Sequence, residues 1–403
     1  MTEKSAMNIM VVDDEVFMRN MLILTLGNLG YSVTHACESA ALALEAIDCA
    51  VRPPDLILLD LNMPDMDGVE FVRYLVERKY SGSLILVSGE DERVLQAAEK
   101  LVQAHHITVL GHVRKPVTQD TLGALLRKWT PAVANRVLSA HGTYAPEALR
   151  LAIANGELVN HYQPMVSLVT GRVVGMETLV RWRHPIDGLV FPDQFIGVAE
   201  SNGLICDLTR AVSADALTQT RSWREELGLP LQIAINVSMD DLASLDFADY
   251  IAGAAGAATV PSHDVTLEVT ESQWMQDLRT PLEVLTRLRI KRFRLSIDDF
   301  GTGHSSLAQL RDIPFSELKI DRGFVHGAWA DETVRAIFDT SVILAKQLNM
   351  GVVAEGVEDR ADWEFVRRSG CDVAQGYFIA KPMPAAAVHD WIEEWDERAL
   401  IVI

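Results

Sequence analysis

Short apolar runs alternate with stretches of helical periodicity along almost the whole chain. Up to residue 129, runs such as 55–60 (DLILLD) and 83–88 (SLILVS) are almost continuously apolar, as strands buried on both faces are. Between the runs, apolar residues return at helical spacing, as at Leu95, Ala98 and Val102. The pattern predicts an open parallel sheet with helices on both faces. Its predicted strands are 8–12, 31–35, 55–60, 83–88 and 107–113, followed by a helix over 118–129.

The alternation stops over residues 130–145 and then resumes with longer elements. This stretch contains Pro131, small and polar side chains and no sustained period, which predicts an interdomain linker. About eight strands alternating with helices then follow, as in a (β/α)8 barrel, although the first pair reads as antiparallel. The strands are 159–167, 173–180, 231–237, 264–270, 293–298, 317–320, 351–355 and 372–376, and the helices are 206–227, 240–256, 277–290, 332–348 and 359–369. The predicted domains are therefore 1–129 and 146–403.

Composition excludes several classes of partner. The chain has 36 basic and 56 acidic residues, a net charge of -20, and no basic block, so we expect no binding to duplex nucleic acid. No apolar run reaches the roughly 18 to 20 residues that a bilayer span requires. We therefore expect no membrane insertion and a cytoplasmic location.

Carboxylates cluster where two strands of the first predicted sheet end. Asp13 and Asp14 follow the first strand, and Asp60 ends the third. In doubly wound sheets these strand ends flank the point where ligands bind, so the three acids should converge. Converging carboxylates raise one another's pKa values unless a cation such as Mg²⁺ lies between them. Ser88 and Lys115 end neighbouring strands, and this combination could accept and hold a phosphoryl group.

On these residues, positions 7–129 resemble the receiver domain of the response-regulator family. The resemblance implies a flavodoxin-like, doubly wound fold and a sensor histidine kinase as phosphoryl donor. It implies that Asp60 is the phosphoacceptor. It further implies that Asp13, Asp14 and Asp60, with the backbone carbonyl of Asn62, hold one Mg²⁺.

The resemblance also assigns the remaining polar residues at this rim. Ser88 and Lys115 would contact the phosphoryl oxygens, and the Lys115–Pro116 bond would be cis. His112 stands where the family usually has a switching Tyr or Phe. This departure puts the usual coupling of phosphorylation to output in question.

Polar residues also lie at or near the ends of the predicted barrel strands. Barrel enzymes build their sites at the carboxyl ends of strands, so these side chains could face one another over the barrel mouth. Oxygen ligands without His or Cys favour Mg²⁺ or Mn²⁺ over zinc. The residues are Glu177, Asn236, Glu268, Asp298, Asp299, Lys319, Asp321, Glu355 and Gln375.

Two of these acids, Asp298 and Asp299, are adjacent in the stretch RLSIDDFGTG. Neighbouring strand residues normally point to opposite faces. We expect the strand to break into Gly301 and Gly303, so that both carboxylates turn toward the mouth. Two metal ions about 3.5 to 4 Å apart could then share a carboxylate and clamp a phosphodiester.

The motifs ETLVRW, INVS, LEVTES, DDFGTGHSSL, LKID, AEGVE and AQGY resemble, over residues 146–395, the EAL family of cyclic-di-GMP phosphodiesterases. The resemblance implies a modified (β/α)8, TIM-like barrel and two Mg²⁺ or Mn²⁺ ions. The implied reaction opens one 3',5'-phosphodiester bond of cyclic di-GMP to give linear pGpG. A homodimer or higher homo-oligomer is also expected.

The resemblance assigns roles to the polar residues of the barrel. The first ion would be held by Glu177, Asn236, Glu268 and Asp298, and the second by Asp298, Asp299 and Glu355. Lys319 would position the attacking water and stabilise charge on the phosphoryl oxygens, and Glu355 could assist as a base. Gln375 would steady the site, with Asp321 a weaker candidate ligand. Arg181 and Gln163 would contact the substrate.

Two residues depart from the family pattern. Thr178 replaces Ala in the name-giving Glu-Ala-Leu motif, but it should project to the face opposite Glu177. His304 stands where Tyr is common, in a loop that couples metal binding to dimerisation through a Glu corresponding to Glu271.

Three functions fit these motifs. The first is a hydrolase switched by phosphorylation, and the second is a degenerate domain that binds cyclic di-GMP without cutting it. The third is a partner-binding scaffold whose acids are only solvated rims. The hydrolase is favoured because every expected ligand position and Lys319 are filled.

Overall fold

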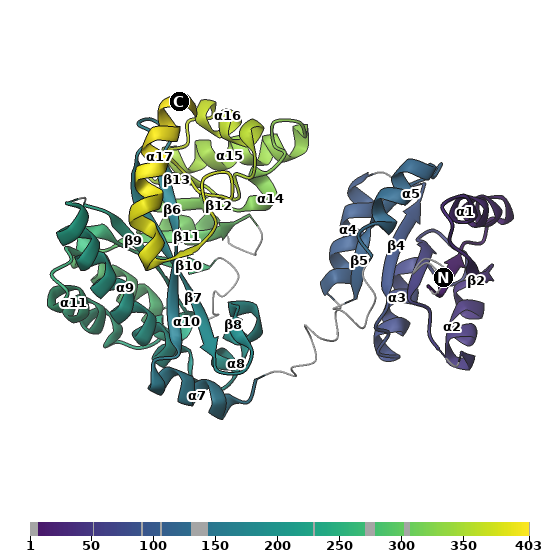
Figure 1. Ribbon diagram of the computed structural model, residues 1–403, viewed down its shortest axis with the longest axis horizontal. Helices are drawn as coiled ribbons and strands as arrows, with labels where there is room; N and C mark the ends of the chain where they lie inside the picture. The colour runs from purple at the N-terminus through teal and green to yellow at the C-terminus, as the bar shows by residue number, and fades with distance from the viewer. Residues whose placement is uncertain are drawn as a thin grey trace. The chain divides into compact units, whose positions relative to one another are not determined.

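The computed structural model in Figure 1 describes residues 7–50, 52–89, 92–104, 107–129, 144–228, 230–270, 279–301 and 307–402. The chain divides into two compact units, Met1–Gly142 and Thr143–Ile403. Most of the predicted linker, residues 130–143, lies outside the described residues. None of the helices in the described part of the chain has the length and apolar character needed to cross a membrane.

The first unit is a five-stranded parallel sheet in the order β2-β1-β3-β4-β5, with helices on both faces. Alternate strand residues supply two separate cores: Met10 and Val12 pack on one face, and Ile9 and Val11 on the other. This confirms the predicted doubly wound, flavodoxin-like architecture. The elements are β1 (Ile9–Val12), α1 (Val16–Asn28), β2 (Val33–Cys37), α2 (Ala40–Cys49), β3 (Leu56–Asp60), α3 (Gly68–Glu77), β4 (Ser83–Ser88), α4 (Glu92–Ala104), β5 (Thr108–Arg114) and α5 (Gln119–Leu126).

The second unit is a closed barrel whose first strand runs against its neighbours. β6 pairs antiparallel with β7 and with β14, and the other barrel strands pair in parallel. This confirms the predicted modified (β/α)8 barrel. Its strands are β6 (Leu158–Ser167), β7 (Val173–His184), β9 (Gln232–Val237), β10 (Val265–Thr270), β11 (Arg294–Phe300), β12 (Glu317–Ile320), β13 (Gly351–Ala354) and β14 (Val373–Ala374). Two short strands were not predicted. β8 (Gly188–Val190) pairs antiparallel with β7, and β15 (Met383–Pro384) pairs antiparallel with β6.

Helices cover the outside of the barrel (Figure 1). They are α7 (Pro146–Asn155), α8 (Ile196–Ser201), α9 (Ile205–Leu227), α10 (Met239–Leu242), α11 (Phe247–Ala257), α12 (Arg279–Ile290), α13 (Leu307–Asp312), α14 (Arg322–Val325), α15 (Glu332–Gln347), α16 (Arg360–Arg368) and α17 (Val388–Val402), with 3-10 turns at Pro192–Gln194, Ser262–Asp264 and Ala385–Ala387. The single helix predicted over 240–256 is wrong. It is divided into α10 and α11, because Ser238 and Asp241 form a capping box that starts a separate one-turn helix.

Candidate active site

A buried lysine lies at the centre of the polar residues that end the barrel strands. Lys319, on β12, is fully buried, and its Nζ lies 2.7 Å from Glu355 Oε1 and 3.0 Å from Glu268 Oε1. The same atom lies 3.1 Å from Asp298 Oδ1 and 3.5 Å from Glu177 Oε2. A buried charge is costly unless it is paired, and here one ammonium faces four carboxylates, which come from β7, β10, β11 and the residue after β13.

The register of the strands brings these side chains close together. Glu268 on β10 lies opposite Asn236 on β9, and Thr270 lies opposite Asp298 on β11. On the other side, Gln163 of β6 lies opposite Glu177 of β7. The barrel therefore gathers residues that are as far as 212 positions apart in the chain, as Gln163 and Gln375 are.

Asp298 and Asp299 turn toward the same site. The strand β11 continues through Phe300, and its pairing with β12 is irregular between Ile297 and Phe300. Asp299 itself has φ of 55°, in the left-handed region that Asp tolerates better than most residues. Carboxylate oxygens of Asp298, Asp299 and Glu355 consequently lie within 4.8 Å of one another. The strand ends directly before Gly301, whose φ of 101° agrees with the expected break there, and the irregularity at Asp299 adds to it; Gly303 lies outside the described residues.

Side-chain amides hold the carboxylate of Glu177. Gln375 Nε2 donates to Glu177 Oε2 at 2.5 Å and to Gln163 Oε1 at 3.0 Å. Asn236 Nδ2 donates to Glu177 Oε1 at 3.3 Å, and Gln163 Nε2 donates to the carbonyl oxygen of Ala380 at 3.0 Å. Both oxygens of Glu177 are therefore oriented before any ligand binds.

Glu268 and Asp298 lack comparable donors, and three acids of the cluster have raised pKa values. Among the described residues, both carboxylate oxygens of Glu268 and Oδ1 of Asp298 have no hydrogen-bond partner apart from their ion pairs with Lys319. Desolvation and neighbouring acids raise the pKa of Glu268 and Glu355 well above the usual range, and they raise the pKa of Asp299 to about 6. With all five acids ionised, Lys319 leaves four negative charges uncompensated. Buried carboxylate oxygens without donors, together with this excess charge, suit divalent cations.

The other predicted residues lie at the margin of this cluster. Arg181 is buried; its Nη1 donates to the carbonyl oxygen of Val180 at 2.8 Å, and its guanidinium lies 4.9 Å from the centre of the Phe191 ring. Its Nε has no hydrogen-bond partner among the described residues. Asp321 accepts from the backbone N–H of Gly323 at 2.8 Å and caps α14.

In the N-terminal unit, Lys115 joins two carboxylates at the carboxyl edge of the sheet. Its Nζ lies 2.7 Å from Asp60 Oδ2 and 3.0 Å from Asp13 Oδ2. Burial raises the pKa of both acids, although Lys115 opposes the shift. Asp14 lies beside them, with a carboxylate oxygen within 4.8 Å of theirs. This arrangement suits a cation as well.

Other predicted residues lie around the two carboxylates. The backbone N–H of Asn62 donates to Asp60 Oδ1 at 3.2 Å. Ser88 is fully buried at the end of β4, and its carbonyl oxygen accepts from the backbone N–H of Lys115 at 2.8 Å. The Lys115–Pro116 bond is cis.

Family models match both units of the chain. A model of the EAL domain matches residues 146–382, and a model of the response regulator receiver domain matches residues 9–127. The chain belongs to the EAL domain family. Its N-terminal unit is a receiver domain.

Two relatives from Pseudomonas aeruginosa resemble different lengths of the chain. The cyclic di-GMP phosphodiesterase RocR is 32% identical over 94% of this chain and 96% of its own length. The bifunctional diguanylate cyclase/cyclic di-GMP phosphodiesterase MucR is 41% identical over 59% of this chain, but only 35% of MucR is covered. RocR therefore matches both units, whereas MucR matches over a length close to that of the EAL domain.

Two solved structures of EAL proteins are also similar to this chain. The PaMucR phosphodiesterase in complex with c-di-GMP has a TM-score of 0.57 and 40% identity, covering 60% of this chain and 98% of that chain. The EAL enzyme Bd1971, in its cAMP- and cyclic-di-GMP-bound form, has a TM-score of 0.59 and 27% identity, covering 68% and 73%.

The structure adds residues to the EAL site that were not predicted. A cavity of about 190 Å³ beside Glu177 and Glu355 is also lined by Arg322, Glu358 and Tyr377. Glu358 is the last residue of the AEGVE motif and Arg322 follows LKID directly, so the motifs already pointed to this neighbourhood. These residues were not predicted because they lie in the loops two to four residues beyond the strand ends, and only the folded loops bring them to the cavity.

A second, mainly apolar cavity of about 220 Å³ also borders β7. It is lined by Thr178 and Asn236 among others, whereas Glu177 lines the first cavity. This placement fits the expectation that Thr178 points away from Glu177.

Three further residues bear on the departures from the family patterns. In the receiver domain, His112 Nδ1 lies 2.5 Å from Glu99 Oε2, which links β5 to α4. Glu271 and His304, the expected coupling residues of the EAL domain, both lie outside the described residues.

Proposed function

We propose that this protein hydrolyses cyclic di-GMP to linear pGpG at the mouth of the EAL barrel, under the control of its receiver domain. The observation that carries the proposal is the buried Lys319 with its ring of carboxylates. RocR, which is similar to this chain over almost its whole length, is a cyclic di-GMP phosphodiesterase. A ring of this kind has more negative charge than one lysine can balance, and it faces a cavity that can admit a phosphodiester.

Two divalent ions, Mg²⁺ or Mn²⁺, would complete this site. Glu177, Asn236, Glu268 and Asp298 would hold one of them, and Asp298, Asp299 and Glu355 the other, with Asp321 as a further candidate. The two ions would balance the four excess negative charges. When bound, such ions lower the pKa of the attacking water and stabilise charge on the phosphodiester oxygens.

The protein's own groups have separate tasks in this reaction. Lys319, which cannot move far from its four carboxylates, would position the attacking water and stabilise charge that develops on the phosphoryl oxygens. Glu355, 2.7 Å from Lys319, would assist as a base. Gln375 would keep Glu177 oriented, and the unpartnered Nε of Arg181 is available to a substrate phosphate, with Gln163 nearby.

The receiver domain would act as a phosphorylation switch. Asp60 would be phosphorylated by a sensor histidine kinase, with one Mg²⁺ held by Asp13, Asp14 and the Asn62 carbonyl. Lys115 already contacts Asp60, so it would move little to reach the new phosphoryl oxygens, and Ser88 would reach them from β4. His112 stands where the family usually has a switching Tyr or Phe, and its pair with Glu99 joins β5 to α4.

The alternative functions predict different measurements. A binding-only domain would take up cyclic di-GMP without turnover, and a scaffold would do neither. Every sequence position at which the family has a metal ligand carries a suitable residue, and Lys319 is paired with the carboxylates. Both features favour the hydrolase. We also propose a homodimer or higher homo-oligomer, which light scattering would test.

Hydrolysis should be measured with Mg²⁺ or Mn²⁺, with linear pGpG resolved by chromatography, and with and without beryllofluoride. We expect metal-dependent turnover in the unmodified protein and no turnover in Glu177→Ala. Tight binding of cyclic di-GMP without any product, in either metal, would contradict hydrolysis and support the binding-only function.

A further inference from the structure

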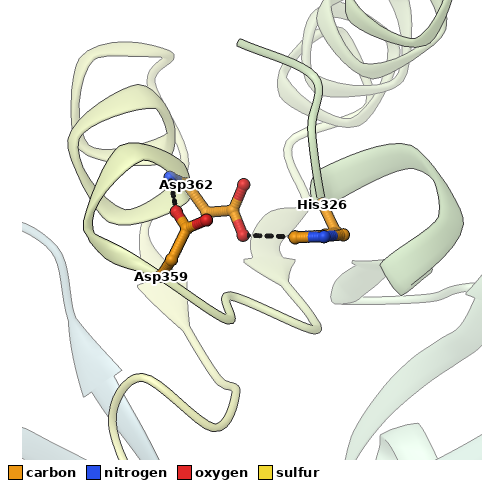
Figure 2. Close-up of side chains that lie close together, drawn as sticks. All are labelled: His326, Asp359 and Asp362. Atoms are coloured by element: carbon orange, nitrogen blue, oxygen red, sulfur yellow. Dashed lines mark hydrogen bonds and ion pairs between the residues drawn. The ribbon is translucent and has the colours of Figure 1, made fainter. Parts of the chain in front are cut away.

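Asp362 is a fully buried carboxylate in the first turn of α16, outside the cluster around Lys319. Its Oδ2 lies 2.8 Å from His326 Nδ1 and accepts from the backbone N–H of Glu358 at 3.1 Å. Its Oδ1 accepts from the backbone N–H of Gly327 at 3.0 Å. Figure 2 shows the His326 ring directed at this carboxylate, with Asp359 on the far side, where it caps the Asp362 backbone N–H. Both oxygens are therefore used, as a buried carboxylate requires.

The donors to Asp362 come from two different segments. His326 and Gly327 follow α14, which begins directly after Lys319 and Asp321 at the end of β12. Glu358 ends the short loop that begins with Glu355 at the end of β13. Asp362 thus ties together the two segments that follow the central lysine and its closest carboxylate.

A second contact joins the same two segments. Arg322 Nη2 lies 2.7 Å from Glu358 Oε1. Gly356, in the loop, has φ of 65°, and a Cβ added there would lie 2.3 Å from Cγ of Arg322. The stem of Arg322 therefore lies directly on the loop, which leaves no room for a side chain at position 356.

We propose that Asp362, together with His326, is a positioning group that holds the Glu355–Glu358 loop on the end of α14 and so keeps Glu355 in place beside Lys319. This inference rests on the proposed hydrolase function, because it assigns Asp362 a task in that reaction. Asp362 acts through the loop and does not itself line the cavity.

The three side chains in Figure 2 could also be considered as a metal site, since their ligand atoms lie within 4.8 Å of one another. An ion there would have to displace the donors that occupy both oxygens of Asp362. The cluster is therefore better interpreted as a hydrogen-bonded clasp, by which we mean Asp362 with His326 and the backbone N–H groups of Gly327 and Glu358.

The charge state of His326 should affect the clasp. Around its ring lie Asp362, Glu358 and Asp359, and Arg322 is paired with Glu358. The hydrogen bond to Asp362 and these acids raise the pKa of His326. The charge-assisted bond is therefore complete below the ordinary histidine pKa of about 6.5 and weakens as the pH rises through the raised value. A neutral ring can still donate from Nδ1, so part of the clasp remains at high pH.

The test compares three variants of the full-length protein: Asp362→Asn, His326→Phe and Asp372→Asn. Asp372 is the matched control because its carboxylate also bridges a cation and a backbone N–H. It accepts from Lys346 Nζ at 2.6 Å and from the backbone N–H of Val352 at 2.7 Å, at the end of β13 opposite to Glu355. We expect Asp362→Asn to lower kcat by about 10- to 100-fold with little change in KM, since a positioning group acts on the reacting geometry. Asp372→Asn should stay within about twofold of the unmodified protein.

A pH series adds a readout that general destabilisation would not change. The ratio of kcat between the unmodified protein and His326→Phe should be largest near pH 6 and should fall as the pH rises. A ratio that does not vary with pH, together with an unchanged kcat in Asp362→Asn, would overturn the proposal.

Hydrogen exchange tests the clasp without catalysis. Peptides covering 322–328 and 355–362 should exchange about tenfold faster in Asp362→Asn, and at the normal rate in Asp372→Asn. If the unmodified protein proves unable to hydrolyse cyclic di-GMP, the hydrolase proposal fails but this measurement still decides whether the clasp exists. Unchanged exchange in Asp362→Asn would refute the clasp even in an active enzyme.

Discussion

At the scale of single residues, Lys319 and its acids depend on one another. Without bound ions, Lys319 provides the nearest positive charge to four carboxylates, two of which have strongly raised pKa values. Desolvation and mutual repulsion of these acids are unfavourable for folding, and Lys319 offsets part of that cost. The same arrangement that suits cations therefore makes the metal-free domain sensitive to the loss of one side chain.

We predict that Lys319→Ala abolishes turnover and lowers the free energy of unfolding of the metal-free domain by about 3 to 5 kcal/mol, because it leaves buried acids unpaired. Mg²⁺ or Mn²⁺ should recover part of this loss, which urea titration with and without metal would measure. Lys346→Ala is the control: its pair with Asp372 is exposed, so its effect should be no more than about 1 kcal/mol. Equal losses in the two variants would argue against the assigned role of Lys319.

The left-handed backbone at Asp299 leads to a second prediction at this scale. Asn tolerates this conformation about as well as Asp, whereas Val does not. Asp299→Asn should therefore keep the stability of the domain but lose most of its turnover, since it removes a candidate metal ligand. Asp299→Val should in addition destabilise the domain by about 1 to 3 kcal/mol. Full activity in Asp299→Asn would remove Asp299 from the metal site.

At the scale of elements, the start of α3 helps to place Asp60, the proposed phosphoacceptor. Gly68 begins α3, and a Cβ at this position would lie 2.7 Å from the backbone carbonyl oxygen of Asp60. Asp67 caps the same helix by accepting from the backbone N–H of Glu70 at 2.7 Å. The close approach of α3 to the end of β3 therefore depends on a missing side chain.

We predict that Gly68→Ala destabilises the receiver domain by about 1 to 3 kcal/mol and slows phosphorylation by acetyl phosphate, because α3 and Asp60 must move apart. Gly27→Ala, on α1, is the control. Nothing lies within 4 Å of a Cβ there, so the change should be neutral or stabilise by up to about 1 kcal/mol. A neutral Gly68→Ala would mean that the close contact relaxes without cost.

At the scale of the whole molecule, the described residues form two units with separate cores. The clusters of the receiver domain contain no residue beyond Trp129, and those of the EAL domain contain none before Tyr144. Each unit therefore has the buried apolar surface that independent folding requires.

We predict that a fragment of residues 143–403 unfolds cooperatively and hydrolyses cyclic di-GMP without the receiver domain. Its activity should not respond to beryllofluoride, whereas that of the full chain should. An inactive but folded fragment would show that the receiver domain contributes more than regulation.

Asp60→Asn in the full chain provides the complementary prediction. This variant should incorporate no phosphate from acetyl phosphate and should show the same hydrolysis rate with and without beryllofluoride, because it lacks the carboxylate that we propose as the phosphoacceptor. Phosphate incorporation measured by mass spectrometry in Asp60→Asn would place the phosphoacceptor elsewhere.

Local pattern in the sequence determined both architectures and the neighbourhood of each site. Continuous apolar runs such as SLILVS predict buried strands because such strands must be apolar on both faces, and β4 spans that run from Ser83 to Ser88. Polar residues that follow such runs lie at strand ends, which is why Lys319, Glu355 and Asp60 could be named from the sequence.

Tertiary structure decided how these residues meet. The left-handed turn at Asp299, the amide contacts of Gln375 with Glu177, and the clasp of Asp362 with His326 depend on strand register and on loops folding over one another. These contacts join residues from 36 to 198 positions apart, and no local pattern specifies which distant partner a side chain will face.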